Sequence, residues 1–341
     1  MGDECRHVHE HVGVLDMSAF SKATVSGRGA DEWLNSIVAN NVPKGVGRIG
    51  LCHMLSLNGG VRAEFTIYKR AENSFYLVFA GASERHDWDY LTKLAPKDGS
   101  VTLQKITTQM GVLVLAGPKS RDVLQKLTDT DLSNHNFKWL SGKSINVGYA
   151  QAEALRVNFV GELGWELHHP IEMQNYIFDE LMRVGSDFNI KPFGIRAMDS
   201  MRIEKSYRLI PREMSIEYSA YESGLDRFVR LDKENDFIGK EALTDWQERG
   251  AVNGFVTMEV LDVVDADARG SEAIYKDGMV VGRGTSGGYG WRCGKSLALG
   301  IVRKDLTAVG TELEIEILGE KYKSIVIDES PFDPNNQCLR S

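Results

Sequence analysis

The chain has 341 residues, of which 42% are hydrophobic and 26% are charged, and its formal net charge is −8. This composition is typical of a globular protein long enough for two domains, and it excludes a disordered or collagen-like chain. The acidic balance argues against binding to nucleic-acid backbones, which needs a basic surface. Glycine is frequent, with 34 residues against eight prolines, and this enrichment raises the question of a nucleotide-binding loop.

The N-terminal segment and the cysteines bear on metals and location. Three histidines, His7, His9 and His11, stand near Cys5, but we favour an exposed polar turn over a metal site, and no metal is predicted. The four cysteines form no CxxC pair, which argues against a zinc ribbon or a disulfide framework. The chain shows neither an apolar signal core at its start nor an apolar run of about 18 residues. We therefore expect a cytoplasmic protein with no membrane partner and no nucleic-acid partner.

An internal repeat with an offset of 90 residues organises the first half of the chain. The segments 25–34 and 115–124 each predict a strand, a glycine turn and an amphipathic helix. The same offset relates two later helices and the strands before them, predicted at about 75–80, 84–95, 165–169 and 171–185. Residues of about 15–95 and 105–185 are therefore predicted to be two copies of one α/β unit. A cleft shared by the two copies is the natural ligand site.

The pattern changes after residue 250. A helix is predicted at about 194–205, followed by a linking stretch over 206–250. Beyond it, short strands are predicted at 255–261, 273–275, 279–281, 297–302, 313–317 and 324–327, with hairpin turns at Lys276–Gly278 and Leu318–Glu320. The predicted fold class is α+β. A domain over 1–250 contains two pseudo-repeated α/β units around a central cleft, and a domain over 251–341 forms a small antiparallel β-barrel.

A glycine-rich segment at 284–296 ends in Gly-Lys-Ser, as phosphate-binding loops do. The spacing fails, because Tyr289 stands where such a loop needs its first glycine, and the following residues predict a strand rather than a helix. No Gly-x-Gly-x-x-Gly motif opens a helix after a strand, so no flavin or nicotinamide domain is predicted within the chain. We expect this segment to be a flexible loop of the β domain that can lie over a cleft.

The strand predicted at 61–68 alternates between apolar and polar side chains. Ala63, Phe65 and their apolar neighbours share one face, and Glu64 with Thr66 shares the other. In an isolated sheet the polar face would meet solvent. In a duplicated unit it can line the shared cleft, and Tyr76 and Val78 of the next strand would join it there. Both interpretations of Glu64 stay open on the pattern alone.

A second acidic position lies in the segment 159–167. Glu166 occupies the place of Tyr76 at the 90-residue offset, so both are expected to face the cleft. A carboxylate among aromatic side chains such as Phe159 needs a hydrogen-bond partner if it is buried. A flat heterocycle with adjacent N–H donors, such as a pterin or guanine, would satisfy it. The alternative is a structural arginine partner, Arg156 or Arg202.

These segments carry a family resemblance that covers nearly the whole chain. The chain resembles the glycine-cleavage T-protein (aminomethyltransferase) family, and within it the tetrahydrofolate-binding C-terminal region of dimethylglycine and sarcosine dehydrogenases. The resemblance is carried by Leu15–Ser18, His53–Leu55, Ser83–Asp87, Arg156–Leu167, Gly194–Lys205, Glu222–Leu225, Asp236–Leu243 and Thr285–Tyr289. The stretch 236–241 lacks the cysteine of the iron–sulfur-maturation relatives, which speaks against that branch.

The resemblance implies a role for each matching residue. Glu64 stands where the family places its catalytic acid, usually an aspartate, and Glu166 matches the glutamate that binds the pterin edge. Met198 replaces an arginine of the T-proteins, which puts that contact in doubt. The folate-binding positions implied by the resemblance are Phe20, Glu64, Thr66, Tyr76, Val78, Phe159, Glu166, Met198 and Tyr289.

The resemblance also implies tetrahydrofolate as the cofactor and a one-carbon transfer as the activity. We expect the chain to capture the methyl-derived carbon of an N-methyl amine, of the dimethylglycine or sarcosine type, as 5,10-methylenetetrahydrofolate, with a flavin-dependent dehydrogenase as partner. One alternative is a stand-alone tetrahydrofolate-dependent demethylase that takes a methyl group directly from a small-molecule donor and gives 5-methyltetrahydrofolate. A second is a non-catalytic folate-binding subunit. A stand-alone module, one subunit of a split enzyme and a truncated reading frame all stay open.

Overall fold

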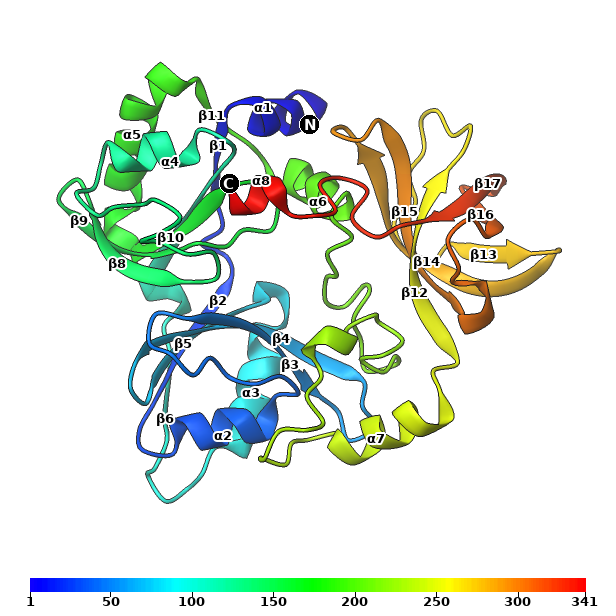
Figure 1. The fold of residues 1–341 in the computed structure, drawn as a ribbon, viewed down its shortest axis with the longest axis horizontal. Coiled ribbons are helices and arrows are strands. Elements are labelled where there is room, and N and C mark those ends of the chain that lie inside the picture. The colour runs from blue at the N-terminus through cyan, green and yellow to red at the C-terminus, as the bar shows by residue number, and fades with distance from the viewer.

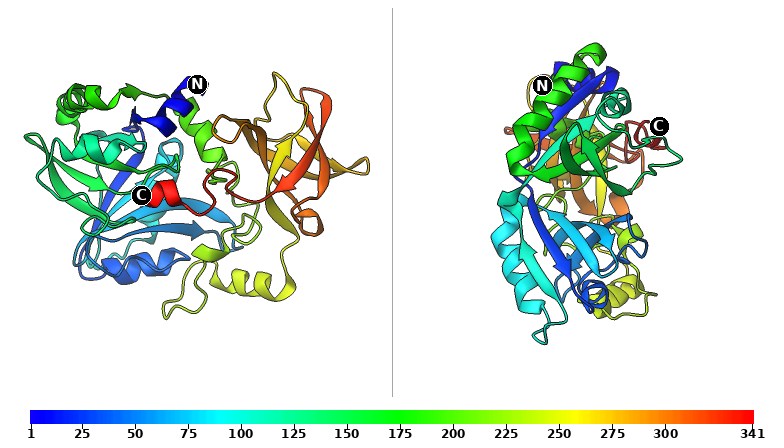
Figure 2. Two further views of the ribbon diagram at one scale, coloured as in Figure 1. Left: turned by 45° about the horizontal axis from the view of Figure 1, so that its top comes forward. Right: turned by 90° about the vertical axis from the view of Figure 1, so that its left-hand side faces the viewer.

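The computed structural model describes residues 1–341, and three bodies surround a central connecting segment in it (Figure 1). Two of the bodies are built on open sheets of five and six strands, and the third is a closed barrel. Seen from the side, the two sheet bodies lie one above the other (Figure 2). The fold is therefore α+β with a C-terminal β-barrel, as the sequence predicts.

The first sheet has the strand order β3-β4-β5-β2-β6. Its strands are β2 (Ser21–Ser26), β3 (Ile49–Leu55), β4 (Val61–Ala71), β5 (Ser74–Phe79) and β6 (Thr102–Lys105). Two helices pack on one face, α2 (Ala30–Ile37) and α3 (Glu84–Leu94), and a 3-10 turn at Gly81–Ser83 precedes the second of them. Apolar residues of β4 and β5, including Ala63, Phe65 and Leu77, pack beneath these helices. The opposite face of the sheet carries no helix and packs against the second half of the chain.

The second sheet has the order β11-β1-β7-β10-β9-β8. Its strands are β1 (Val12–Asp16), β7 (Met110–Ala116), β8 (Gly142–Val147), β9 (Ala150–Leu155), β10 (Gly164–Pro170) and β11 (Ile190–Pro192). The helices α4 (Ser120–Gln125) and α5 (Gln174–Gly185), with a 3-10 turn at Ile171–Met173, cover one face. Both helices begin 90 residues after their counterparts α2 and α3, which confirms the predicted repeat.

The two halves exchange a strand with each other. β6 begins at Thr102, 90 residues after the start of β1 at Val12, so each strand opens one copy of the repeat. However, β1 pairs with β7 of the second copy, and β6 pairs with β2 of the first. Each sheet therefore depends on backbone hydrogen bonds from the other copy, and the two copies are tied together through both sheets.

The helix-free faces of the two sheets meet in an apolar cluster. Tyr68, Tyr76 and Val78 of the first sheet pack there with Leu155 of the second, and Phe20 contacts the cluster. Arg70 of β4 reaches Glu153 of β9, with 2.8 Å between Nε and Oε2. The face of β4 that carries Glu64 and Thr66 is thus turned toward the second half of the chain rather than toward bulk solvent.

The N-terminus forms a helix, α1 (Gly2–Glu10), and the expectation of an exposed polar turn is wrong. The reason is that Cys5 and Val8 lie three residues apart on one face of this helix. Both are fully buried in an apolar cluster with α6 (Ile195–Ile203). No group of three or more histidine, cysteine or acidic side chains in the chain has a geometry that could hold a metal ion.

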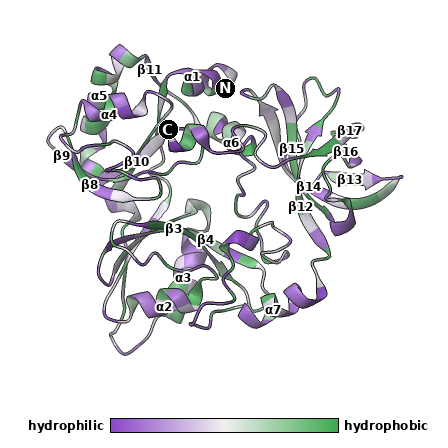
Figure 3. Ribbon diagram, viewed as in Figure 1, coloured by the Kyte–Doolittle hydropathy of each residue, from purple (hydrophilic) through white to green (hydrophobic).

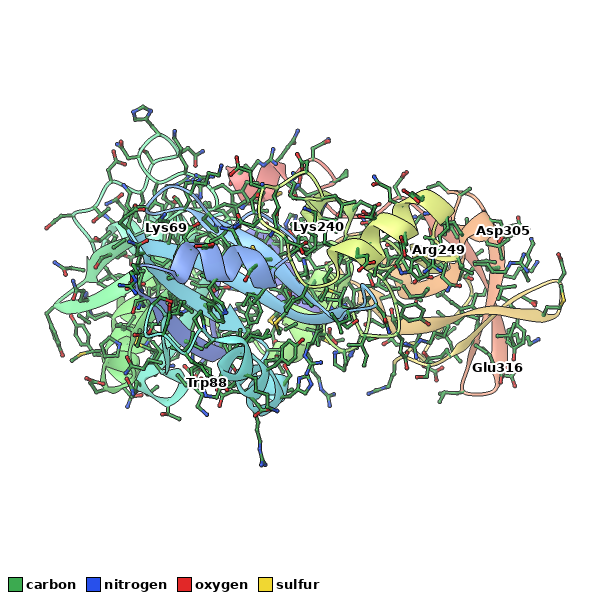
Figure 4. The ribbon with its side chains drawn as sticks, turned by 90° about the horizontal axis from the view of Figure 1, so that it is seen from below. Lys69, Trp88, Lys240, Arg249, Asp305 and Glu316 are labelled. Atoms are coloured by element: carbon green, nitrogen blue, oxygen red, sulfur yellow. The ribbon has the colours of Figure 1, made fainter.

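A long connection leads from α6 to the barrel. It contains a 3-10 turn at Asp226–Phe228 and the helix α7 (Lys240–Arg249). α7 lies at the lower right in Figure 1, between the first sheet's body and the barrel. Figure 4 labels Lys240 and Arg249 near the two ends of this helix. It is coloured mainly as hydrophilic in Figure 3, and Leu243 anchors it in an apolar cluster of the connection.

The barrel closes in the order β12-β15-β14-β13-β16-β17. Its strands are β12 (Asn253–Val260), β13 (Ala273–Lys276), β14 (Met279–Gly290), β15 (Lys295–Arg303), β16 (Glu312–Ile317) and β17 (Glu320–Ile327), and α8 (Gln337–Arg340) follows. Both predicted hairpin turns are present as two-residue turns with positive φ, Asp277-Gly278 and Leu318-Gly319.

The glycine-rich segment is not the flexible loop that the sequence analysis predicts. Residues 284–290 continue β14, which pairs with β15 through Gly290. The glycines are needed because β14 is closely packed: a Cβ on Gly287 would lie 2.6 Å from the carbonyl oxygen of Ala268, and one on Gly290 would lie 2.9 Å from Cγ of Glu204. No helix of the protein combines the length and apolar character that a membrane span needs.

Candidate functional site

Glu64 lies on β4 directly opposite His53 on β3. The Glu64 side chain is 27% exposed, whereas His53 is 2% exposed, and His53 Nε2 lies 3.0 Å from Glu64 Oε1. The ring of Phe228, from the connection, packs on His53 with 5.3 Å between ring centroids. No lysine or arginine forms an ion pair with Glu64, so its second carboxylate oxygen is available to a ligand.

Glu166 lies on β10, and its side chain is 12% exposed. Its Oε2 lies 3.2 Å from Nε2 of His168, and Nδ1 of His168 lies 2.9 Å from the hydroxyl of Tyr76. Burial raises the pKa of Tyr76 above its ordinary value, so the phenol keeps its proton and donates. The Glu166 side chain is therefore held by His168 of its own strand, and His168 is in turn held by Tyr76 of the first half of the chain.

The arginine alternative for Glu166 is wrong. Arg156 donates to the carbonyl oxygen of Phe137 and to an oxygen of the C-terminal carboxylate of Ser341. Arg202 is paired with Asp199 and Glu213. Neither guanidinium group bonds to Glu166, whose one side-chain partner is His168.

The other predicted residues of the first half lie on or next to the same face of the first sheet. Thr66 is half-buried and pairs across the sheet with Val78, which is 9% exposed. Phe20 is half-buried and contacts two apolar clusters, one that contains Val78 and one that contains Met198. Tyr76 is fully buried, so in this structure it offers no surface to a ligand.

The predicted residues of the second half come from three different segments. Met198 on α6 is 6% exposed and packs in a cluster with Phe159 and Phe20. Phe159 also lies beside Tyr207, with 5.6 Å between ring centroids. Tyr289 on β14 is 38% exposed, and its carbonyl oxygen accepts a hydrogen bond of 2.8 Å from the Ser200 hydroxyl of α6. The structure thus brings Phe20, Phe159 and Met198 together, while Tyr289 is tied to α6 through its backbone.

Two hollows of the surface lie elsewhere. One, of about 230 Å³, is lined by polar residues that include Arg212, Arg269 and Arg283. The other, of about 700 Å³, runs along α3 beside Trp88. None of the predicted folate-binding residues lines either hollow, so the sequence assignment of the site depends on Glu64, Glu166 and the aromatic residues around them.

Two histidines of the site have no role in the sequence analysis. His53 could have been found from the sequence, because it lies within the matching segment His53–Leu55. In the β3–β4 hairpin it is the cross-strand neighbour of Glu64. His168 could have been found from strand periodicity, since it lies two residues after Glu166 and so shares its face. Neither pattern shows that the imidazole is the carboxylate's hydrogen-bond partner, because this depends on side-chain packing.

The residues present fit a reduced folate. Each of the two carboxylates has one oxygen bonded to a histidine and one oxygen without a partner in the protein. A pterin edge presents adjacent N–H donors to such acceptors, and Phe20 and Phe159 are half-buried aromatic residues whose rings keep some exposed surface. The set contains no nucleophilic serine or cysteine, which agrees with a ligand that supplies its own nucleophiles.

Comparisons with known proteins find matches over nearly the whole chain. Residues 1–233 match the family model of the GCVT N-terminal domain, and residues 254–333 match that of the glycine cleavage T-protein C-terminal barrel domain. Mitochondrial dimethylglycine dehydrogenase of Mus musculus is 39% identical over 330 residues, which cover 96% of this chain and 38% of that protein. An aminomethyltransferase of Thermoanaerobacter sp. (strain X514) is 30% identical over 335 residues, which cover 96% of this chain and 88% of that one.

The fold has a solved counterpart. The crystal structure of the glycine cleavage system aminomethyltransferase T from Bartonella henselae matches with a TM-score of 0.87 and 22% sequence identity, over 97% of this chain and 89% of that chain. The chain spans about two fifths of the length of the mammalian dehydrogenase and almost nine tenths of the bacterial aminomethyltransferase.

Proposed function

The chain belongs to the glycine cleavage T-protein family, and from this premise we propose that it transfers a methyl-derived carbon from an N-methyl amine to tetrahydrofolate. The proposed donor is an amine of the dimethylglycine or sarcosine type, and the proposed product is 5,10-methylenetetrahydrofolate. The identity of 39% to a dimethylglycine dehydrogenase supports this donor class. Because relatives of the chain include dehydrogenases of such amines, we propose that a flavin-dependent partner oxidises the amine.

The proposed reaction balances as two coupled steps. The partner removes a hydride from the N-methyl group, which reduces its flavin and leaves an electrophilic iminium carbon on the amine. Bound tetrahydrofolate supplies two nitrogen nucleophiles, N5 and N10. Transfer of the carbon to both nitrogens displaces two N–H protons, one of which leaves with the free amine and the other of which is released.

Glu64 is the proposed catalytic group. Its free carboxylate oxygen can accept a displaced proton and stabilise the positive charge that develops next to it. His53 keeps the other oxygen in place, so the carboxylate does not have to be ordered during the reaction. The observation that carries the proposal is this partly exposed acid without a cationic partner, at the family's acid position on β4.

Glu166 is the proposed binding group for the pterin edge. Its partial burial makes each hydrogen bond to it stronger than in water, and the aromatic residues Phe20 and Phe159 would exclude water beside the reacting atoms. Most of the rate gain is then expected from holding the iminium carbon and the folate nitrogens together.

The proposal is tested with the purified chain, tetrahydrofolate, dimethylglycine or sarcosine, and a flavin-dependent dehydrogenase for these amines. We expect the chain to increase 5,10-methylenetetrahydrofolate at the expense of free formaldehyde. The Glu64→Gln variant is expected to bind tetrahydrofolate normally and to turn over about 10²-fold more slowly.

Three results would count against the proposal. Formation of 5-methyltetrahydrofolate from a methyl donor without the flavoprotein would favour a stand-alone demethylase. Binding of tetrahydrofolate without any carbon transfer would favour a non-catalytic folate-binding subunit. Absence of tetrahydrofolate binding in calorimetry would overturn the folate assignment itself.

A further inference from the structure

Tyr76 and Glu166 occupy equivalent positions of the two repeats, and a single histidine connects them. The Tyr76 hydroxyl lies 2.9 Å from Nδ1 of His168, and Nε2 of His168 lies 3.2 Å from Oε2 of Glu166. We propose that Tyr76 and His168 act as positioning residues that orient the Glu166 carboxylate for its ligand, so that docking of the first half onto the second prepares the ligand-binding acid. This proposal rests on the proposed function, because it takes the ligand to be tetrahydrofolate.

The direction of the hydrogen bonds follows from the groups present. A carboxylate can only accept, so His168 donates through Nε2–H and its Nδ1 is the acceptor for Tyr76. The phenol can serve as that donor because burial raises the pKa of Tyr76 above its ordinary value. Both Tyr76 and His168 are fully buried, so water does not replace either partner. The chain of donors therefore runs in one direction, from the first half to Glu166.

The packing around the pair holds it rigidly. The rings of Tyr76 and His168 meet edge to face, with 5.3 Å between centroids. The Arg70 guanidinium lies over the Tyr76 ring at 4.1 Å and is bonded to Glu153 of the second sheet. With Oε2 fixed in this way, the other oxygen of Glu166 is presented at the partly exposed end of the side chain, where a ligand can donate to it.

The test begins with Tyr76→Phe, which removes one hydroxyl and keeps the ring. Calorimetry with tetrahydrofolate is expected to show a dissociation constant raised about five- to tenfold, since one hydrogen bond to the positioning histidine is lost. In the coupled assay, KM for tetrahydrofolate should rise by a similar factor while kcat changes little. The matched control is Tyr68→Phe. Tyr68 is the cross-strand neighbour of Tyr76, its hydroxyl makes no hydrogen bond, and its removal should leave the dissociation constant unchanged.

A double-mutant cycle separates positioning from direct contact. His168→Gln keeps an amide N–H donor for Glu166 and an amide oxygen that can accept from Tyr76, and His168→Leu removes both. We call the action of Tyr76 on Glu166 through His168 the relay. If the relay exists, Tyr76→Phe adds nothing to the effect of His168→Leu, and the Gln variant binds tetrahydrofolate more tightly than the Leu variant. Multiplicative effects of Tyr76→Phe and His168→Leu would overturn the relay, because Tyr76 would then act independently of His168. Unchanged affinity in Tyr76→Phe would overturn it as well.

Glu166→Ala shows which idea has failed. If this variant binds tetrahydrofolate as the wild type does, the role of Glu166 under the proposed function is wrong, and the relay falls with it. If Glu166→Ala weakens binding but Tyr76→Phe does not, the proposed function stands and only the relay is refuted. The melting temperature of each variant reports loss of fold, and the near-isosteric Tyr76→Phe keeps the relay testable should a His168 variant fail to fold.

Discussion

His53 donates to Glu64 across the β3–β4 hairpin, with 3.0 Å between Nε2 and Oε1. This is the one hydrogen bond that the His53 side chain makes, because its Nδ1 is buried and has no partner. The proton of the imidazole is accordingly placed on Nε2, where an acceptor exists. A buried histidine thus serves the most exposed acid of the site and nothing else.

Replacing His53 should therefore lower turnover more than stability. His53→Leu is expected to reduce kcat about tenfold, since the loss of one hydrogen bond to a charged group is worth about 1.5 kcal/mol, and to leave the dissociation constant for tetrahydrofolate nearly unchanged. The melting temperature should not fall, because the change also removes the unpartnered buried Nδ1. His53→Gln, whose amide N–H can reach Glu64, should recover most of the rate. A wild-type kcat in His53→Leu would show that the carboxylate is positioned without the histidine.

Truncating Glu166 should weaken folate binding. Glu166→Ala removes a carboxylate that accepts charge-assisted hydrogen bonds in a nearly buried place, so a loss of about 1.5–3 kcal/mol is expected. This corresponds to a dissociation constant raised by about 10- to 150-fold in calorimetry. Glu166→Gln is the size-matched control and should fall between the alanine variant and the wild type. Equal affinity in all three proteins would return Glu166 to a purely structural role.

The 90-residue offset predicts the repeat correctly because it reports local structure. The helices α3 and α5 begin at Glu84 and Gln174, as the spacing requires, and the apolar periodicity of β4 and β5 identifies the face under the helices. The exchange of β1 and β6 between the halves could not be predicted, because strand pairing over long range leaves no mark in a single sequence. The glycine-rich part of β14 could not be predicted as a strand for a related reason. Its glycines are required by close packing against residues such as Ala268, which are brought near only in the folded chain.

The sequence singles out two acids as candidates for the site, but it does not identify their hydrogen-bond partners. The alternation of β4 places Glu64 on the polar face of its strand, the repeat offset makes Glu166 the counterpart of Tyr76, and the family resemblance implies a role for both acids. An arginine partner for Glu166 was an equally reasonable expectation from the sequence. The structure assigns Arg202 to Glu213 instead, because the backbone path after α6 brings these two together, and His168 takes the position beside the acid.

Arg292 should be a main determinant of how the barrel stays attached to α6 and to the second sheet's body. It lies in the turn after β14, its side chain is 0% exposed, and it forms ion pairs with Glu162 of the second sheet's body and Glu204 at the end of α6. Removing one member of a buried ionic group leaves the others uncompensated, so Arg292→Ala is expected to cost about 3–5 kcal/mol of unfolding free energy in urea.

The matched control is an exposed arginine of the barrel. Arg303 pairs with Asp305 at 2.8 Å on the surface, with side-chain exposures of 48% and 63%, and Arg303→Ala should change the unfolding free energy by less than about 1 kcal/mol. Similar losses in the two variants would mean that the buried cluster at Arg292 contributes little to stability.

His9 should make part of the stability depend on pH. Its hydrogen bond to the Glu162 carboxylate raises the pKa of His9 above the ordinary value, desolvation opposes the shift, and the nearby Arg292 and Glu204 act in opposite directions. A histidine whose folded pKa is raised stabilises the protein fully below the unfolded pKa of about 6.5, and the effect is lost as the pH rises through the folded value. The side chain is 42% exposed, so solvent screening keeps the effect small.

The measurement compares urea unfolding of the wild type and His9→Asn at pH 5.5 and pH 8.5. The stability difference between them is expected to be larger at pH 5.5, by less than about 1 kcal/mol because the pair is partly exposed. His7 provides a control of opposite sign on the same helix, since burial lowers the pKa of His7. The unfolding free energy of the wild type relative to His7→Asn should decrease as the pH falls below about 6.5. The same pH trend in both variants would show that a general property of α1, rather than the His9–Glu162 pair, sets the dependence.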